Sequence, residues 1–224
     1  MPARLRPTAP IAAEAILVGD PGRALLLAQE LLEQPKMSNH ARGLWGYSGE
    51  TADGRALTVQ STGMGGPSAT LVLTDLAELG VRRAIRVGTC CGLAPECELG
   101  QLLLVEKALA GGASTAASDE ALERAAAAPE PELAAALGDA LGEESQPAIV
   151  ASGDAHPAEL PLPAGAIAAD MQTASLLGRA ASLGIACAAA LIVAESSSGQ
   201  MLDDEALEAA AKRAGRAAAA SLSP

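Results

Sequence analysis

The chain has 224 residues, 50% of them apolar, which is enough to bury a full hydrophobic core. Its net charge of −12, without a basic stripe, excludes nucleic acid as the expected partner. No apolar run is as long as a membrane span, and residues 1–10 lack the apolar core of a signal peptide, so we expect a soluble cytoplasmic protein that binds no membrane. Four cysteines without a CxxC pair or a nearby histidine cluster favour reduced thiols over disulfides or a metal site.

Strand and helix patterns alternate along the first half of the chain, which predicts an α/β fold. In chain order we expect a strand at 16–18, a helix at about 24–33, strands at 44–47 and 56–61, a helix at 67–79, and strands at 84–87 and 102–105. Gly80 follows the second helix and suits the position just after a helix end.

The second half continues the alternation after an Ala- and Glu-rich stretch, 111–146, which predicts surface helix and loop. We then expect strands at 149–151 and 166–169, a helix at 171–183, a strand at 188–194, and a last helix that ends near Ser221. Gly184 is suited to stop a helix and Asp203 to begin one. No linker or repeat divides the chain, so we expect residues 1–224 to form a single domain.

The most informative segment runs from Ile16 to Arg23. A buried strand ends in a turn that contains Gly19 and Gly22, and a leucine-rich helix follows. Glycine lets the backbone approach an anion, while the free N–H groups and the dipole of the helix N-terminus attract negative charge. This pattern predicts a site for a small anion, and phosphate is the best candidate.

Two more Gly-rich segments follow predicted strands, at Ser61–Ser68 and at Arg86–Gly92. A single turn of this kind is more often structural than functional. An arginine beside a buried strand is costly unless an anion pairs with it. That anion could be a ligand or one of the 27 acidic residues of the chain, and the sequence leaves both open.

These three segments, with residues 39–47 between them, resemble the nucleoside phosphorylase/uridine phosphorylase family in its hexameric branch, which includes purine nucleoside phosphorylases. The similarity runs from about Ile16 to Leu104 and resumes from Asp154 to Ala194. The resemblance implies a twisted, partly closed mixed β-sheet surrounded by helices. It also implies phosphorolysis of a purine-type nucleoside or deoxynucleoside to free base and sugar 1-phosphate, with phosphate as co-substrate and no metal or organic cofactor.

The resemblance assigns a phosphate site. Its residues would be Gly19, Arg23, Arg42, Arg86 and Thr89. Planar guanidinium groups bind phosphate oxygens in pairs, which agrees with this assignment. Arg42 matches an arginine that the family donates across a dimer interface. The resemblance therefore implies a homo-oligomer with a dimer as its minimal unit, and a hexamer built as a trimer of dimers.

The sugar and base sites depart more from the family. Met64, Met171 and Gln172 would hold the sugar, and Gln172 stands where the family has a glutamate, which weakens a hydrogen bond to a sugar hydroxyl by about 1 kcal/mol. The residues implied for the base are His156, Cys90 and Gly92. Met171 also fits an ordinary apolar helix position, and His156 fits an ordinary loop position.

Glu195 is the candidate catalytic acid. It lies 24 residues after Met171, the distance at which the family has its catalytic Asp or Asn. Cleaving the glycosidic bond leaves negative charge on the base, which a carboxylic acid can stabilise. The extra methylene of Glu195 shifts the carboxyl group by about 1.5 Å. A solvated loop glutamate is the alternative interpretation.

Other departures keep rival functions open. A family histidine near the N-terminus falls on Ala3, the arginine that assists the acid has no secure equivalent in Ser196–Gly199, and an aromatic pair near His156 is missing. The glutamine and arginine with which uridine phosphorylases recognise pyrimidines are not recognisable, which favours purines. The alternatives are a uridine phosphorylase, a nucleosidase that uses water, or a nucleoside- and phosphate-binding homologue with impaired catalysis.

Overall fold

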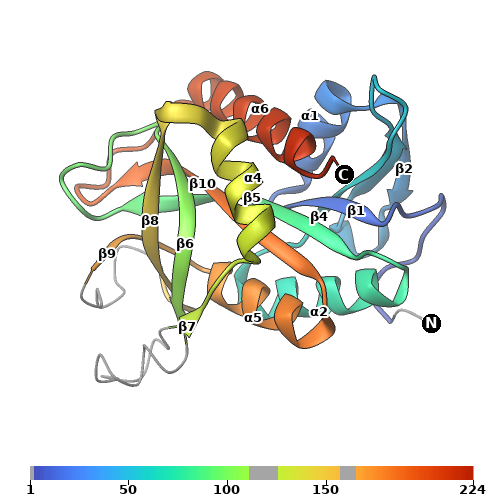
Figure 1. Ribbon diagram of the computed structural model, residues 1–224, viewed down its shortest axis with the longest axis horizontal. Coiled ribbons are helices and arrows are strands. Elements are labelled where there is room, and N and C mark those ends of the chain that lie inside the picture. Colours follow the sequence, from blue (N-terminus) through green and yellow to red (C-terminus); the bar gives the residue numbers. More distant parts are fainter. Residues whose placement is uncertain (1–2, 111–125, 157–164, 224) are drawn as a thin grey trace.

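The computed structural model describes residues 3–110, 126–156 and 165–223. Ten strands of this part form one mixed sheet: β1 (Glu14–Val18), β2 (Glu33–Asn39), β3 (Gly46–Glu50), β4 (Ala56–Ser61), β5 (Arg83–Gly92), β6 (Leu102–Ala110), β7 (Ala126–Ala127), β8 (Ser145–Ser152), β9 (Ala166–Asp170) and β10 (Ala186–Ser196). Five α-helices of the described residues surround it: α1 (Pro21–Leu31), α2 (Gly65–Glu78), α4 (Pro131–Leu141), α5 (Thr173–Leu183) and α6 (Asp204–Ser221) (Figure 1). The predicted α/β class is confirmed.

Part of the sheet closes on itself. β10 pairs in parallel with β5 and antiparallel with β6, and the pairings β6–β8, β8–β9 and β9–β5 complete a ring. From β5 the sheet continues outward through β1, β4 and β3 to the edge strand β2. This is the twisted, partly closed mixed sheet that the family resemblance implied.

One edge of β5 is shared by two neighbours. β1 pairs with Arg83–Arg86 at the start of the strand, whereas β9 pairs only with Cys91 and Gly92 at its end. Residues 87–90 therefore lie where β1 has ended and β9 has not yet begun. In α/β proteins a divergence at the carboxyl ends of parallel strands leaves a crevice that binds ligands.

The helices form two layers on opposite faces of the sheet. α2 and α5 pack on one face, and α1, α4 and α6 pack on the other (Figure 1). Successive residues of β1 alternate between the two cores: Ala15 and Leu17 face the α2–α5 layer, and Ile16 and Val18 face the other. Both faces of the central strands are thus buried, which explains their almost continuous apolar sequence.

The predicted helix-terminal residues are confirmed. The carboxylate of Asp203 accepts a hydrogen bond from Ala206 N at 2.8 Å and caps α6. Gly184 ends α5 with a φ of 67°, and Gly80 follows α2 with a φ of 103°, values that favour glycine. Asp20 caps α1 by accepting from Arg23 N at 2.7 Å, which fixes the backbone of the first predicted anion-binding turn.

Some boundaries differ from the sequence expectation. α1 ends at Leu31, and the residues from Glu33 belong to β2, an edge strand that the expected helix partly overlapped. β2 carries Pro35, has a positive φ at Gln34 and is mostly polar, so its pattern does not mark it as a strand. The expected 44–47 strand begins at Gly46, after the 3₁₀ turn η1 (Ala41–Gly43).

The stretch 111–146, expected as surface helix and loop, is described from residue 126 onward. Here α4 buries Leu133 and Leu137 in the core, and the turn η2 (Gly142–Glu144) leads into β8. The helix expected from Met171 begins at Thr173, because Met171 and Gln172 form the turn between β9, which ends at Asp170, and α5.

Candidate functional site

A cavity of about 240 Å³ lies at the divergence between β1 and β9. Eight of the twelve predicted site residues line it: Gly19, Met64, Arg86, Thr89, Cys90, Met171, Gln172 and Glu195. They come from the loops after β1 and β4, from β5, from the β9–α5 turn and from β10. Sequence segments that lie far apart in the chain therefore meet at one place.

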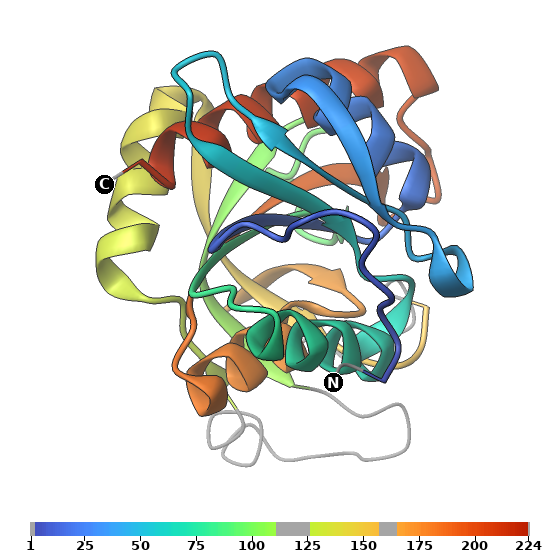
Figure 2. The same ribbon diagram turned by 90° about the vertical axis from the view of Figure 1, so that its right-hand side faces the viewer.

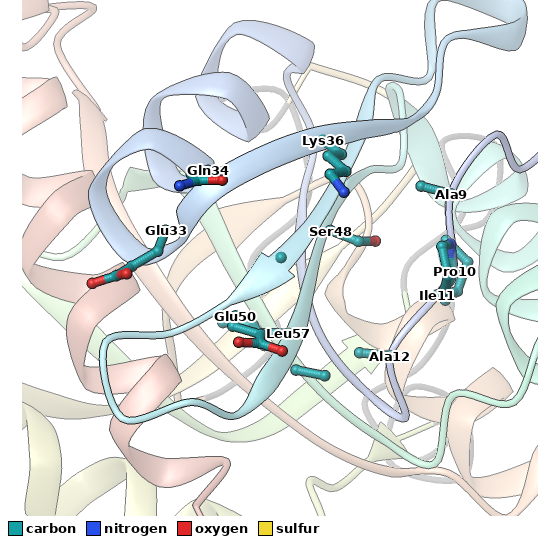
Figure 3. A pocket seen from close by; sticks show the side chains of 12 residues that line it. Ala9, Pro10, Ile11, Ala12, Glu33, Gln34, Lys36, Ser48, Glu50 and Leu57 are labelled. Carbon is teal, nitrogen blue, oxygen red and sulfur yellow. The ribbon is translucent and has the colours of Figure 1, made fainter.

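A larger hollow of about 540 Å³ lies elsewhere, between residues 9–12 and strands β2 to β4. None of the predicted site residues lines it. Glu33 and Glu50, which are cross-strand partners, both face it, and Lys36 lies on the same strand as Glu33 (Figure 3). Two adjacent carboxylates disfavour an anion, so we place the candidate site in the smaller cavity.

Arg86 is the central charged group of the site. Its side chain is buried, and three of its N–H groups donate hydrogen bonds: Nε to Thr173 Oγ1 at 3.0 Å, Nη1 to Gln172 Oε1 at 2.7 Å, and Nη2 to Asp170 Oδ2 at 2.9 Å. A guanidinium carries five N–H groups. One N–H on each terminal nitrogen therefore has no partner among the described residues. Arg86 is both paired with an acid and able to offer two donors to a ligand.

Asp170 and Thr173 are site residues that the sequence reasoning missed. Asp170 is buried, pairs with Arg86, and accepts hydrogen bonds from Thr173 N, from Thr173 Oγ1 at 2.6 Å and from Ser152 Oγ. It therefore fixes the start of α5 and the orientation of Arg86 together. An acid at the end of a predicted strand, just before a predicted helix, was the available signal.

Gly88 makes room for this arrangement. A Cβ atom there would lie 2.5 Å from Arg86 Nη2 and 2.6 Å from Arg86 Cζ. Residues two apart in a strand point to the same face, so any larger residue at 88 would displace the guanidinium. An arginine followed two positions later by a glycine was the signal for this role.

Gln172 uses its whole carboxamide group within the protein. Nε2 donates to Gly63 O at 2.6 Å and to Gly65 O at 3.2 Å, and Oε1 accepts from Arg86 Nη1 and from Thr62 Oγ1. The side chain thus ties the loop before α2 to Arg86. A glutamate could not donate to the two carbonyl groups. The assignment of Gln172 to the sugar stays a prediction.

The other two predicted phosphate arginines do not line this cavity. Arg23 lies at the start of α1 and faces a neighbouring hollow of about 300 Å³ between α1 and α6. Burial lowers the pKa of Arg23, Asp20 acts in the opposite direction, and the nearby charge of Arg86 lowers it further. Arg42 is exposed on η1. Neither guanidinium forms a hydrogen bond or an ion pair within the described part of the chain.

Glu195 lies at an irregularity of β10, where the pairing with β5 shifts register between Val193 and Glu195. It forms an isolated β-bridge with Met201, and its Oε2 atom lies 3.6 Å from His156 Nε2. His156 is exposed and does not line the cavity, but it lies beside the candidate acid. The structure thus brings together the residue predicted for the acid and one predicted for the base.

Gly92 has a packing role. It is buried outside the cavity lining, and a Cβ atom there would lie 2.6 Å from Cys97 Cβ and 2.9 Å from Val193 Cγ1. Cys90 and Cys91 do line the cavity. Burial raises the pKa of these thiols, and that of Cys187 to about 12, so they are protonated at neutral pH. Within the described ranges no cluster of three metal-ligating side chains occurs.

A family model described as the phosphorylase superfamily matches residues 14–223. The chain belongs to this superfamily. Its relatives include proteins named purine nucleoside phosphorylase DeoD-type. The one from Oceanobacillus iheyensis is 39% identical over 99 residues, which are 44% of this chain and 42% of the relative. The one from Limosilactobacillus reuteri is 41% identical over 92 residues, which are 41% of this chain and 39% of the relative.

These alignments span about two fifths of the length of the curated relatives. The superfamily match, in contrast, covers the sheet, all five described helices and every residue of the cavity lining. Among the described residues, no helix has the length and apolar character needed to cross a membrane.

Proposed function

We propose that this protein is a nucleoside phosphorylase, a pentosyltransferase that cleaves a purine-type nucleoside or deoxynucleoside with phosphate. The observation that carries the proposal is one cavity that combines Gly19, Arg86 and Thr89 with Met171 and the carboxyl group of Glu195. Membership of the phosphorylase superfamily and the names of the relatives support the same chemistry.

Phosphate would bind at the end of β1 and β5. The two unpartnered N–H groups of Arg86, the hydroxyl group of Thr89 and the backbone N–H after β1 are its donors. A Cβ atom on Gly19 would meet only Gly63 O at 3.6 Å and Gln172 Oε1 at 3.9 Å. Packing therefore does not require glycine at this position, and close approach of a ligand to the backbone explains it.

The charges of the site indicate that Arg86 alone would not attract phosphate strongly, and that other arginines would contribute. Asp170 offsets the charge of Arg86 at 2.9 Å, so further positive charge of this subunit near the site comes from Arg23, which has the carboxylate of Asp20 close to it. Arg42, exposed on η1, would add a second one to the site of a partner subunit. The neutral side chain of Gln172 also favours anion binding, because a carboxylate in its place would add a negative charge beside the phosphate.

In the reaction, a phosphate oxygen forms a bond to C1′ of the sugar while the bond from C1′ to the base nitrogen breaks. The electron pair of that bond leaves with the base, and the sugar passes through an oxocarbenium-like transition state. Glu195 would stabilise the leaving base by a hydrogen bond or by proton donation at a ring nitrogen. Met171 and Met64 would pack against the sugar. No step needs a metal or an organic cofactor.

A panel of purine and pyrimidine nucleosides, incubated with and without phosphate and followed by chromatography, tests this function. We expect release of purine bases that depends on phosphate, together with formation of sugar 1-phosphate. Cleavage at equal rates without phosphate would instead identify a nucleosidase, and cleavage of uridine alone a uridine phosphorylase. Phosphate binding without turnover of any nucleoside would identify the impaired homologue.

We also propose a homo-oligomer, with a dimer as the smallest active unit and a hexamer as the assembly, that works in the cytoplasm. Support for the dimer comes from Arg42, which is exposed with a positive φ of 60° and does not reach the cavity of its own subunit. Support for a reducing compartment comes from the four cysteines, all of which are buried and free.

A further inference from the structure

Sulfur-bearing side chains gather around the candidate cavity. The chain has only five methionines and four cysteines, and Met64, Met171, Met201, Cys90 and Cys91 all line this one cavity. No aromatic side chain lines it within the described residues. The chain has no Phe, its single Tyr is buried in the core of the α1–α4–α6 layer, and its single Trp, Trp45, lies just before β3.

Two of these methionines are exposed at the rim of the cavity. Met64 is 85% exposed just before α2, and Met201 is 66% exposed after the turn that follows β10. Large apolar side chains exposed beside a cavity indicate a surface that a ligand covers. Neither residue contributes to the hydrophobic cores that stabilise the fold.

Met201 is held in place by the backbone around it. The 196–200 turn is closed by hydrogen bonds from Ser196 N to Gln200 O at 2.9 Å and from Gly199 N to Ser196 O at 2.9 Å. Leu202 N donates to Ala194 O at 2.9 Å on the other side of the bridge between Met201 and Glu195. The backbone of Met201 is therefore fixed beside Glu195, whose carboxyl group would face the leaving base.

We propose that Met201, with Cys90 and Cys91, forms the base-binding surface beside the sugar-facing Met64 and Met171, and that Met201 is a base-contacting residue that takes the place of an aromatic ring. The inference rests on the proposed function, because a nucleoside phosphorylase binds a nucleobase, and that base is the planar group that this surface would contact. A thioether is polarizable and packs favourably against an aromatic ring, and its unbranched chain adapts to rings of different outline. The surface therefore accepts a purine-type bicyclic base with little discrimination between ring substituents.

The test measures binding of adenine and hypoxanthine by isothermal titration calorimetry, without phosphate or nucleoside. We expect Met201→Ala to weaken binding of both bases by about tenfold. The matched control is Met37→Ala, because Met37 is 41% exposed on β2 and does not line the cavity. It should bind like the wild type. Met201→Leu, which keeps the apolar volume, should recover only part of the loss.

Equal affinity of Met201→Ala and wild type would overturn the inference, as would a wild-type protein that binds neither base. Full recovery by Met201→Leu would remove the role of sulfur. Base binding that depends on Met201 in a protein without phosphorolysis would support this inference and contradict the proposed reaction. Phosphorolysis with base affinity unaffected by Met201→Ala would support the proposed reaction and contradict this inference.

A second measurement uses the chemistry of sulfur. Hydrogen peroxide converts exposed methionines to sulfoxides, which peptide mass spectrometry detects. We expect saturating adenine to slow oxidation of Met201 at least several-fold and to leave oxidation of Met37 unchanged. Equal rates at Met201 with and without adenine, in a protein that binds adenine, would place the base elsewhere.

Discussion

Arg86 is a buried charge that is paired with an acid and still has N–H groups that a ligand could bind. Three of its N–H groups are held by Asp170, Gln172 and Thr173, and Gly88 provides the space for its guanidinium group. Asp170 lines the cavity, but its carboxylate oxygens are engaged by Arg86, Ser152 and Thr173, so we assign it a positioning role. Removing one partner of a buried ion pair leaves the other charge without compensation, and this is costly.

Asp170→Asn should therefore lower the free energy of unfolding by about 3–5 kcal/mol in phosphate-free buffer. Phosphate should restore more of this stability in the variant than in the wild type, because the anion then supplies the missing counter-charge. Thermal unfolding with and without phosphate measures both effects. Asp53→Asn is the control, since Asp53 is exposed and pairs with Arg55 at the surface. An equal phosphate-dependent shift in wild type and Asp170→Asn would contradict the role of Arg86.

Gly88→Ala should raise the KM for phosphate by about 10²-fold, because the new methyl group displaces the guanidinium by roughly 1 Å. The KM for the nucleoside should change much less, a split that general loss of stability would not produce. Gly178→Ala serves as the control, since the atom closest to its added Cβ is Ala127 Cβ at 4.0 Å. Initial rates at varied phosphate and at varied nucleoside provide the measurement. Equal changes in both KM values would argue for a purely structural effect.

At the scale of elements, α2 connects the site with the start of the chain. Its first residues are held by Gln172 through Gly63 and Gly65, and farther along the helix Asp75 binds the N-terminal segment. The backbone N–H groups of Ala3, Arg4 and Leu5 all donate to the buried Asp75 carboxylate. Figure 2 shows the N-terminal segment running beside α2.

Asp75 should make the fold sensitive to acid. Burial acts to raise the pKa of Asp75, but the hydrogen bonds from Leu5, Arg4 and Ala3 outweigh it, and the pKa lies below the ordinary 3.8. The group therefore stabilises the fold above about pH 4, and this contribution is lost as the pH falls from 3.8 through the lowered value. Asp75→Asn should be less stable than wild type at pH 7, and the difference should be smaller at about pH 3, below the ordinary pKa of 3.8. Denaturant unfolding at both pH values measures this, and a constant difference would contradict it.

At the scale of the whole molecule, the closed ring and the open extension of the sheet share β5, and the cavity lies where they separate. In the proposed dimer, each subunit would contribute Arg86 to its own site, while Arg42, which is exposed and has no partner among the described residues, would complete the site of the other subunit. The proposed dimer therefore predicts that two different defects can compensate each other.

Arg42→Ala and Arg86→Ala should each abolish phosphorolysis when expressed alone. Co-expressed in equal amounts, they should recover about a quarter of the wild-type rate, because half of the dimers are mixed and each mixed dimer has one intact site. Light scattering on each variant controls for loss of the oligomer. A mixture as inactive as its components, with the oligomer intact, would show that Arg42 serves no partner.

Much of the architecture could be predicted from local chemistry. The capping role of Asp203, the left-handed glycine at 184 and the buried strands depend on neighbouring residues, and the structure confirms them. β2 could not be predicted in this way, because a polar edge strand with Pro35 takes its conformation from pairing with β3. The Ala-rich helix α4 carries Leu133 and Leu137 one turn apart, which marks an apolar face, but the structure is needed to show that this face is buried in the core shared with α6.

Short motifs in a fixed order were enough to indicate the family, the α/β class and the set of glycines and arginines that point to phosphate. The three-dimensional packing, in contrast, sets how Arg86 is paired, which groups hydrogen-bond to the carboxamide of Gln172, and that Met201 lies beside Glu195. The bonds of Arg86 to Asp170 and Gln172 cross 84 and 86 residues of the chain. Such contacts depend on the packing of β5 against the β9–α5 turn, and no local pattern specifies that packing.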